Sequence, residues 1–424
     1  MTMICVIGSK KMRMRGWWPV LLVVFWGGWF TGCGCSGGNP GTNNPPADSD
    51  LDGAVDGADG QPVDSTVDAD GELPDGGTHY EYCKETFFQL PPTTDDHVHG
   101  PMLGGNYVTY ARYLNYPESE TQYDLYLFDL ELCTEYLICD VERSQLPGSI
   151  YNSQVFWNDS RFLYDSQDPD YHRVELYLFD IPTWTETRLT DSIEMKISPL
   201  VHGDYVVFLD NTDAPDGYFG LSLMNLVTSE QKTLATWEAA TEEYSISDRY
   251  VVWAGRSFDA TSYGKDVFYY DLLTEETHHL EGTRQHHVVM VTETQGKILW
   301  VKNDNLYFSI MLHDIVSGDD VELTDGSFDC VYPRARGNLV VWWTYEYSGG
   351  TYAGNPAQRD VYLFDLDTGE GRRVTDVSST WSGRSPDPPW LPIEKDHGPN
   401  TSEFFVLNLL KGGYIDTSGH VIAE

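Results

Sequence analysis

Basic residues are scarce in this sequence of 424 residues, where 26 Lys and Arg stand against 66 Asp and Glu and the formal net charge is −40. Binding to nucleic-acid phosphates requires Lys and Arg at the contact surface. The composition therefore argues against a nucleic-acid-binding protein. The same excess of negative charge is compatible with simple solubility, with Ca²⁺ binding or with a cationic ligand.

Common short signatures of catalysis are also missing. The chain has no G-x-S-x-G nucleophile elbow, no P-loop and no H-E-x-x-H zinc motif. None of its seven cysteines forms a C-x-x-C pair, the spacing expected for a zinc or thioredoxin-like redox site. An enzymatic site would have to be assembled from residues far apart in the sequence.

The N-terminal apolar stretch is too short for a transmembrane helix. Trp17–Phe30 has 14 uncharged residues, whereas a membrane span needs roughly 20. Four basic residues precede this stretch, an order typical of an export signal. Phe30-Thr31-Gly32-Cys33 follows and resembles the bacterial lipobox, in which small residues precede the cysteine that becomes the lipidated N-terminus.

The lipobox resemblance implies a signal peptide at residues 1–32 and a lipid anchor on Cys33. Two or three acyl chains would hold the protein stably in the bacterial cell envelope. Gly34 stands where many inner-membrane lipoproteins have Asp, which favours the outer membrane. An ordinary secretory signal or an uncleaved anchor is the alternative interpretation.

Residues 33–78 are predicted to form a disordered, lipid-anchored tether. From residue 36 onward this segment is rich in Gly, Pro, Asp, Ser and Thr and has neither aromatic nor basic residues. It cannot bury enough apolar surface to offset its chain entropy. Its like charges repel one another and extend the chain, which would hold the following domain away from the lipid.

One spacing within the tether resembles the Ca²⁺ loops of EF-hand and dockerin modules. It consists of Asp48, Asp50, Asp52, Asp56 and Asp59, with Gly53 after the third. Asp59 occupies the position where Glu usually supplies two oxygens, and no amphipathic helix flanks the loop. A Ca²⁺ site and a chance match in an Asp-rich segment both remain open.

The rest of the chain, residues 79–424, contains a repeat. An apolar strand motif ending in Asp or Asn recurs six times, with a weaker seventh copy, and the terminal residues of the copies are Asp129, Asp180, Asn225, Asp271, Asp314, Asp365 and Asn408. A β-branched and aromatic strand precedes each strong copy, and a turn with a short polar strand follows it. A further strand is expected before the first, around His97–Leu103, Met195–Val201 and Val331–Arg334.

Four short strands every 43–51 residues are the signature of a propeller blade. We therefore predict an all-β fold, a β-propeller of six or seven four-stranded blades, and favour seven. A β-sandwich would not explain six copies of one strand sequence. Residues 84–90 resemble the fourth strand of a blade and are predicted to complete the last blade, closing the ring. The terminal Asp of each copy is expected to bond backbone groups of the next turn.

The repeat also carries a family resemblance. The pattern Asp-hydrophobic-Tyr-hydrophobic-Phe-Asp-hydrophobic, as in Asp360–Leu366, followed by a Thr-Gly turn and a strand closing in Leu-Thr-Asp, resembles TolB-type and related WD-like propellers. The resemblance covers roughly residues 85–424. It implies the fold, whereas propellers host many activities.

Cysteine and histidine residues supply the remaining candidate sites. Cys133 and Cys139 flank a predicted hairpin and are candidates for a disulfide in an oxidising envelope, and Cys83 and Cys330 would pair only if the fold joins them. Free thiols are the alternative. The candidate metal ligands are Asp95, Asp96, His97 and His99, and a second histidine group comprises His278, His279, His286 and His287.

Three functions follow from these observations. The favoured one is a lipid-anchored envelope propeller that binds a protein, a peptide or a glycan. The second is a surface scaffold without a small ligand. The third is a metal-dependent polysaccharide lyase or hydrolase, which would require His and carboxylate side chains to converge at the propeller axis.

Overall fold

The computed structural model describes residues 77–422 with short gaps, the longest of which are 162–173 and 346–358. These residues belong to the second of two compact units, Gly60–Glu424. Nearly all regular structure in this part is β-strand. It contains no helix that is long and apolar enough to cross a membrane.

The strands form seven antiparallel blades, which confirms the predicted fold and the higher blade number. Blade 1 comprises β3 (His97–Gly104), β4 (Tyr107–Tyr113), β5 (Tyr123–Asp129) and β6 (Thr134–Cys139), and blade 2 comprises β7 (Gln145–Tyr151), β8 (Gln154–Asp159), β9 (Glu175–Asp180) and β10 (Thr185–Arg188). Blade 3 comprises β11 (Lys196–His202), β12 (Tyr205–Asp210), β13 (Gly220–Asn225) and β14 (Gln231–Ala235). Blade 4 comprises β15 (Tyr244–Ile246), β16 (Tyr250–Asp259), β17 (Ser262–Asp271) and β18 (Glu276–Gln285).

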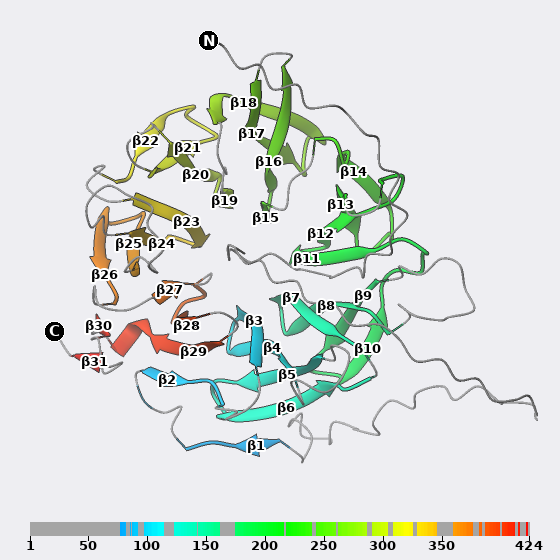
Figure 1. Cartoon of the computed structure of the whole chain (residues 1–424), viewed down its shortest axis with the longest axis vertical. Helices are drawn as coiled ribbons and strands as arrows, with labels where there is room; N and C mark the ends of the chain where they lie inside the picture. The colour runs from blue at the N-terminus through cyan, green and yellow to red at the C-terminus, as the bar shows by residue number, and fades with distance from the viewer. Residues whose placement is uncertain are drawn as a thin grey trace, which may run out of the picture. The chain divides into compact units, whose positions relative to one another are not determined.

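Blades 5 to 7 continue the series. Blade 5 comprises β19 (Val291–Thr294), β20 (Lys297–Asn303), β21 (Phe308–Asp314) and β22 (Asp320–Glu322). Blade 6 comprises β23 (Asp329–Arg336), β24 (Leu339–Tyr345), β25 (Arg359–Asp365) and β26 (Glu370–Arg373). Blade 7 comprises β27 (Trp381–Gly383), β28 (Trp390–Gly398), β29 (Thr401–Asn408) and β2 (Phe87–Gln89). A 3-10 turn (Leu409–Lys411) and the small hairpin of β30 (Tyr414–Ile415) and β31 (Val421–Ile422) follow blade 7. The blades succeed one another around a ring, with each first strand nearest the centre (Figure 1).

The ring closes through a strand from the beginning of the domain. β2 pairs antiparallel with β29, with Phe87 opposite Leu407 and Gln89 opposite Phe405. Phe88 then packs in a cluster with Phe128 of blade 1 and Trp390 of blade 7. This pairing confirms the predicted closure. β1 (Thr78–His79), which the sequence did not indicate, adds a fifth strand to blade 1 beside β6.

Apolar side chains are buried between blades rather than within them. The described residues form seven hydrophobic clusters, and each cluster joins two neighbouring blades. Because neighbouring blades cover both faces of a blade, its second and third strands are nearly continuous in hydrophobicity, as in β8 and β12. A single blade cannot bury these faces alone, so the stability of each blade depends on its neighbours.

Tight, uniform turns occupy one end of the ring, which we call the turn end. There the last residue of each third strand caps the following turn with its side-chain oxygen, as predicted. In six blades this oxygen accepts the N–H two residues on, as in Asp314 with Val316 (2.9 Å); in blade 2 that residue is Pro182, and Thr183 donates instead (2.9 Å). In every blade the next N–H along the chain after the cap donates to the turn between the first and second strands.

Candidate functional site

The connections between second and third strands emerge at the opposite end, which we call the loop end. These connections differ widely in length: β12 ends at Asp210 and β13 begins at Gly220, whereas β24 ends at Tyr345 and β25 begins at Arg359. Fourth strands also return to the next blade at this end. Variable connections on a rigid frame are where propellers and similar scaffolds carry binding residues.

Buried carboxylates mark the loop end of several third strands. Asp124, Glu175 and Asp360 each stand at or near the start of a third strand, Asp266 stands in the middle of the longer β17, and each is at most 6% exposed. A buried carboxylate is costly unless it is paired and hydrogen-bonded. Glu175 lies 3.0 Å from Arg188, Asp360 lies 3.4 Å from Arg373, and Asp266 lies 3.5 Å from His279.

A threonine on the fourth strand side completes this arrangement and explains the Leu-Thr-Asp repeat. Thr190 Oγ1 accepts the N–H of Leu176 (3.0 Å) and donates to Glu175. Thr375 does the same with Val361 (2.9 Å) and Asp360 (3.1 Å). The repeated Thr therefore joins the fourth strand to the third, which is a structural role, in agreement with the sequence interpretation.

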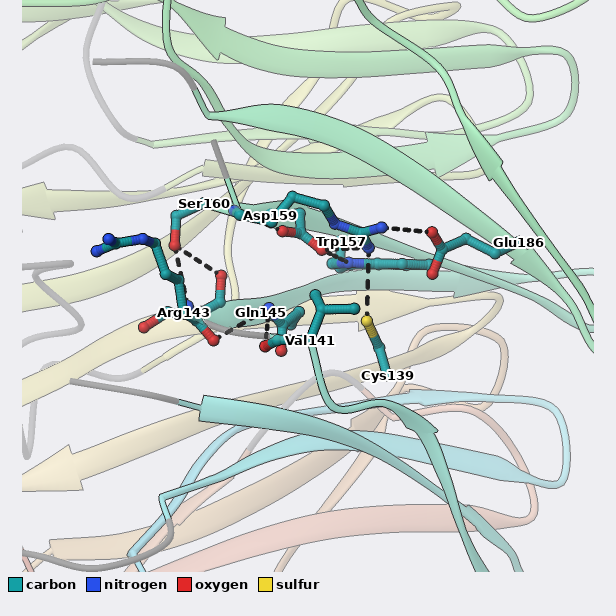
Figure 2. A network of polar contacts seen from close by, with 10 residues as sticks. Cys139, Val141, Arg143, Gln145, Trp157, Asp159, Ser160 and Glu186 are labelled. Atoms are coloured by element: carbon teal, nitrogen blue, oxygen red, sulfur yellow. Dashed lines mark hydrogen bonds and ion pairs between the residues drawn. The ribbon is translucent and has the colours of Figure 1, made fainter. Parts of the chain in front are cut away.

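A polar network at the loop end of blade 2 reaches blade 1 (Figure 2). Arg161, just after β8, reaches Asp159 (2.7 Å) and Glu186 (2.8 Å) and also donates to the Cys139 sulfur (3.5 Å). The indole N–H of Trp157 donates to the fully buried Asp159 (3.1 Å). The guanidinium lies 4.1 Å from the centroid of the Tyr177 ring. The Arg161 guanidinium thus contacts side chains of blade 2 and, through Cys139, blade 1.

This network is suited to holding charge in place rather than to moving protons. Burial alone would lower the pKa of Arg161, but the carboxylates of Asp159 and Glu186 raise the pKa above its usual range. Burial, with the Asp159 carboxylate adding to it, raises the pKa of the Cys139 thiol well above its usual value. The thiol therefore stays protonated at neutral pH and is a poor nucleophile.

Gln145 extends the network toward the centre of the ring. It is completely buried at the start of β7, and its amide N–H groups donate to the carbonyls of Val141 (3.2 Å) and Arg143 (3.0 Å). Within the described part of the chain its Oε1 has no hydrogen-bond partner. This network was not predicted from the sequence. Its only signal in the sequence was the Asp that ends the second strand in blades 2, 3 and 4, at positions 159, 210 and 259.

The two described members of the histidine group, His278 and His279, do not converge. His278 and His279 are adjacent on β18, so their side chains lie on opposite faces of blade 4. His278 stacks on Tyr269 and His279 stacks on Phe268. No group of three or more His, Cys, Asp or Glu among the described residues is placed to hold a metal. His286 and His287, and the side chains of His97 and His99 with Asp95 and Asp96, lie outside the described residues.

The predicted disulfide between Cys133 and Cys139 is wrong. Cys139 is a free, buried thiol, whereas Cys133 is bonded to another cysteine. Cys133 immediately precedes β6 and Cys139 ends it, so the two stand about 20 Å apart along one strand, beyond the reach of a disulfide. Cys330 is a buried thiol that takes part in no disulfide, which rules out its pairing with Cys83.

The partner of Cys133 and the remaining predicted sites lie outside the described residues. These sites are the lipidation residue Cys33, the tether, and the candidate Ca²⁺ ligands Asp48, Asp50, Asp52, Asp56 and Asp59. They stay predictions from the sequence.

Comparisons with known proteins place the fold but not the activity. No protein-family model matches the sequence, and no curated protein matches it. Among solved structures, the β-propeller domain of the Trilobed protease from Pyrococcus furiosus is 10% identical, with a TM-score of 0.54 over 75% of this chain and 94% of that chain. That propeller is described as having an open velcro topology, whereas β2 closes the ring here.

Two enzymes contain similar propellers. Acylaminoacyl peptidase from Pyrococcus horikoshii is 13% identical, with a TM-score of 0.53 over 74% of this chain, and this chain spans only 51% of that protein. An oligogalacturonate lyase from Vibrio parahaemolyticus is 11% identical, with a TM-score of 0.53 over 81% of this chain and 97% of that chain. TolB from Acinetobacter baumannii has a TM-score of 0.39, too low to support an argument. At such low identity these likenesses establish the fold alone, that of a seven-bladed β-propeller.

Proposed function

We propose that this protein is a lipid-anchored propeller of the bacterial cell envelope that binds a protein, a peptide or a glycan. The lipobox-like Phe30-Thr31-Gly32-Cys33 supplies the anchor, and the acidic segment after it supplies the reach. A fully extended tether of residues 33–78 spans at most about 165 Å. The outer membrane is the preferred location, because Gly34 follows the lipidated cysteine.

The observation that carries the binding proposal is the contrast between the two ends of a closed ring. At the turn end all seven blades share one capped turn, while at the loop end the connections between second and third strands range from two residues in blades 4 and 7 to 15 residues in blade 2. The charges buried beneath these connections have partners within the propeller, as Glu175 has Arg188 and Asp159 has Arg161. The frame is therefore fixed, and the loops are free to differ, which is how binding scaffolds are built.

Charge narrows the class of ligand. A protein with a formal net charge of −40 repels polyanions and attracts cationic or neutral molecules. Nucleic acid is therefore not a proposed ligand. The proposed ligands are basic peptides, basic protein surfaces and uncharged glycans.

The anchor is tested by intact mass and by detergent-phase partitioning of the wild type, Cys33→Ala and Cys35→Ala. Cys35 is the matched control, since it is a second cysteine two residues away. We expect a diacylglyceryl mass increment and detergent partitioning in the wild type and in Cys35→Ala, both lost in Cys33→Ala. A wild type without lipid would leave a freely secreted propeller and overturn the anchored function.

The binding function is tested against the enzymatic alternative. The full chain is screened on glycan arrays and by cross-linking in envelope extract, and it is incubated with oligogalacturonate while product formation is followed. Saturable binding without loss of substrate is the expected result. Turnover of the oligosaccharide would replace the binding module with a lyase, and no binding partner of any class would favour a scaffold.

A further inference from the structure

Aliphatic side chains project into solvent from the turn end of three consecutive blades. They stand two residues after the capping Asp or Asn, on the turn between third and fourth strands: Val227 in blade 3, Leu273 in blade 4 and Val316 in blade 5 are 74%, 75% and 86% exposed. In each case the side chain is almost as accessible as in an unfolded chain. We call these three residues the aliphatic arc.

The turn itself does not require an apolar residue at this position. Blades 1, 2 and 6 have the exposed residues Glu131, Pro182 and Asp367 there, in the same capped turn. An exposed aliphatic side chain contributes nothing to the core and costs solvation free energy in water. Three of them on consecutive blades therefore need an explanation other than folding.

The arc is presented on rigid backbone. The N–H groups of Val227, Leu273 and Val316 donate to the capping oxygens at 2.9, 2.8 and 2.9 Å. The residue before each of them donates its own N–H to the neighbouring turn between first and second strands, at 2.7 to 2.9 Å. Little conformational freedom remains to be lost when such a residue is buried by a partner, which favours association.

Carboxylates accompany the aliphatic arc on the same three turns. Five exposed acidic residues lie in segments 226–232, 272–278 and 315–321, namely Glu230, Glu275, Glu276, Asp319 and Asp320. The same segments contain one lysine, Lys232. Lys232 of blade 3 lies 3.8 Å from Glu275 of blade 4, so the turns of neighbouring blades meet at the rim. The surface thus alternates aliphatic tips with negative charge.

This alternation selects the occupant. Carboxylates next to the aliphatic tips disfavour insertion into a membrane with anionic lipids. They also disfavour a second copy of this acidic chain. A partner that offers basic and apolar side chains along one extended segment would satisfy both features of the surface. We propose that the turn end of blades 3 to 5 is a docking surface for a basic, amphipathic segment of a partner protein, an inference that rests on the proposed binding function and names its partner class.

The test measures binding of a fluorescent synthetic peptide of alternating Lys and Leu to the full chain by anisotropy. The variant carries Val227→Ser, Leu273→Ser and Val316→Ser together, which leaves every charge in place. Leu410→Ser is the matched control, since Leu410 has the same turn position in blade 7, is 83% exposed and lies outside the arc. Burial of one such side chain corresponds to about tenfold in affinity, so we expect the triple variant to bind at least tenfold more weakly and Leu410→Ser to bind as the wild type does.

A peptide of alternating Lys and Ser provides the second measurement. Its binding, which depends on charge alone, should be equal for the wild type and the triple variant. Equal affinity of the Lys-Leu peptide for both proteins would overturn the docking surface. Flotation with phosphatidylcholine vesicles that weakens in the triple variant, without binding of the peptide, would replace the protein partner with a membrane. An envelope partner that is still bound by the triple variant would refute the arc and leave the proposed binding function standing.

Discussion

Glu135 offers a sharp test of how blade 1 is held together. Its carboxylate, on β6, is 6% exposed and accepts hydrogen bonds from Arg112 and from the hydroxyls of Tyr110 and Tyr80. Replacing Glu135 by Leu would leave the Arg112 guanidinium, which is 11% exposed, without its counter-charge. Breaking a buried ion pair on one side costs about 3–5 kcal/mol. We expect the free energy of unfolding of Glu135→Leu to fall by about that amount.

The assay is chemical denaturation followed by tryptophan fluorescence, with two companion variants. The double variant Arg112→Leu/Glu135→Leu removes both charges and should recover most of the loss, because an apolar pair often replaces a buried ion pair without cost. Tyr80→Phe removes one hydrogen bond of 3.1 Å and should cost about 1 kcal/mol. Burial and the adjacent Glu135 carboxylate raise the pKa of Tyr80 to about 12, so this hydroxyl donates across the neutral range.

The outcome separates charge from packing. If the double variant is no more stable than Glu135→Leu, the loss comes from altered packing rather than from the unpaired cation. If Glu135→Leu loses less than about 1 kcal/mol, the network does not hold blade 1 together and the reasoning fails.

Three further predictions concern the repeat, the closure and the disulfide. Asp314→Ala should cost about 1 kcal/mol, whereas Asp314→Asn should be nearly neutral at pH 7, since Asn225 caps the same turn in blade 3. The hydrogen bond from the Ser317 N–H lowers the pKa of Asp314 in the folded protein. The ionised Asp314 therefore stabilises the fold above its unfolded pKa, and this stabilisation is lost as the pH falls through the lower folded pKa. Chemical denaturation at pH values between 5 and 2 should show that Asp314→Asn loses less stability on acidification than the wild type. Phe88→Ala should cost about 3–5 kcal/mol, and a melting temperature equal to that of the wild type would contradict closure by β2. Peptide mapping without reduction should find Cys133 linked to Cys83, and alkylation of Cys133 in the native protein would contradict the bond.

The repeat made most of the fold predictable. Each blade buries both faces, so its third strand has to be apolar throughout, and its cap has to be Asp or Asn, as in Asp129 and Asn408. These local requirements recur in the sequence and can be counted. The closing strand was also predictable, because residues 84–90 resemble the polar fourth strand of a blade. Blade 7 was harder, since Pro392 lies within its second strand, β28, and hides the strand pattern.

The polar network between blades 1 and 2 was beyond such reasoning. Arg161 and Glu186 come from different strands of blade 2, and Cys139 meets them only because blade 1 stacks on blade 2. Their spacing in the sequence carries no period, so no local pattern marks them. The same limit produced the wrong disulfide: Cys133 and Cys139 seemed to flank a hairpin, whereas β6 occupies the whole distance between them.

The position of β2 has a mechanical consequence. The strand that closes the ring lies near the N-terminal segment, so a pull on that segment would act first on β1, which is paired with β6, and then on the closure. Every cysteine outside the described residues, from Cys5 to Cys83, precedes Phe87 in the chain, so the bond at Cys133 fixes blade 1 to a point on the N-terminal side of β2. Tension arriving along the chain is then transferred covalently into blade 1, and the hydrogen bonds between β2 and β29 are spared. A propeller held by its N-terminus can in this way bear load without opening.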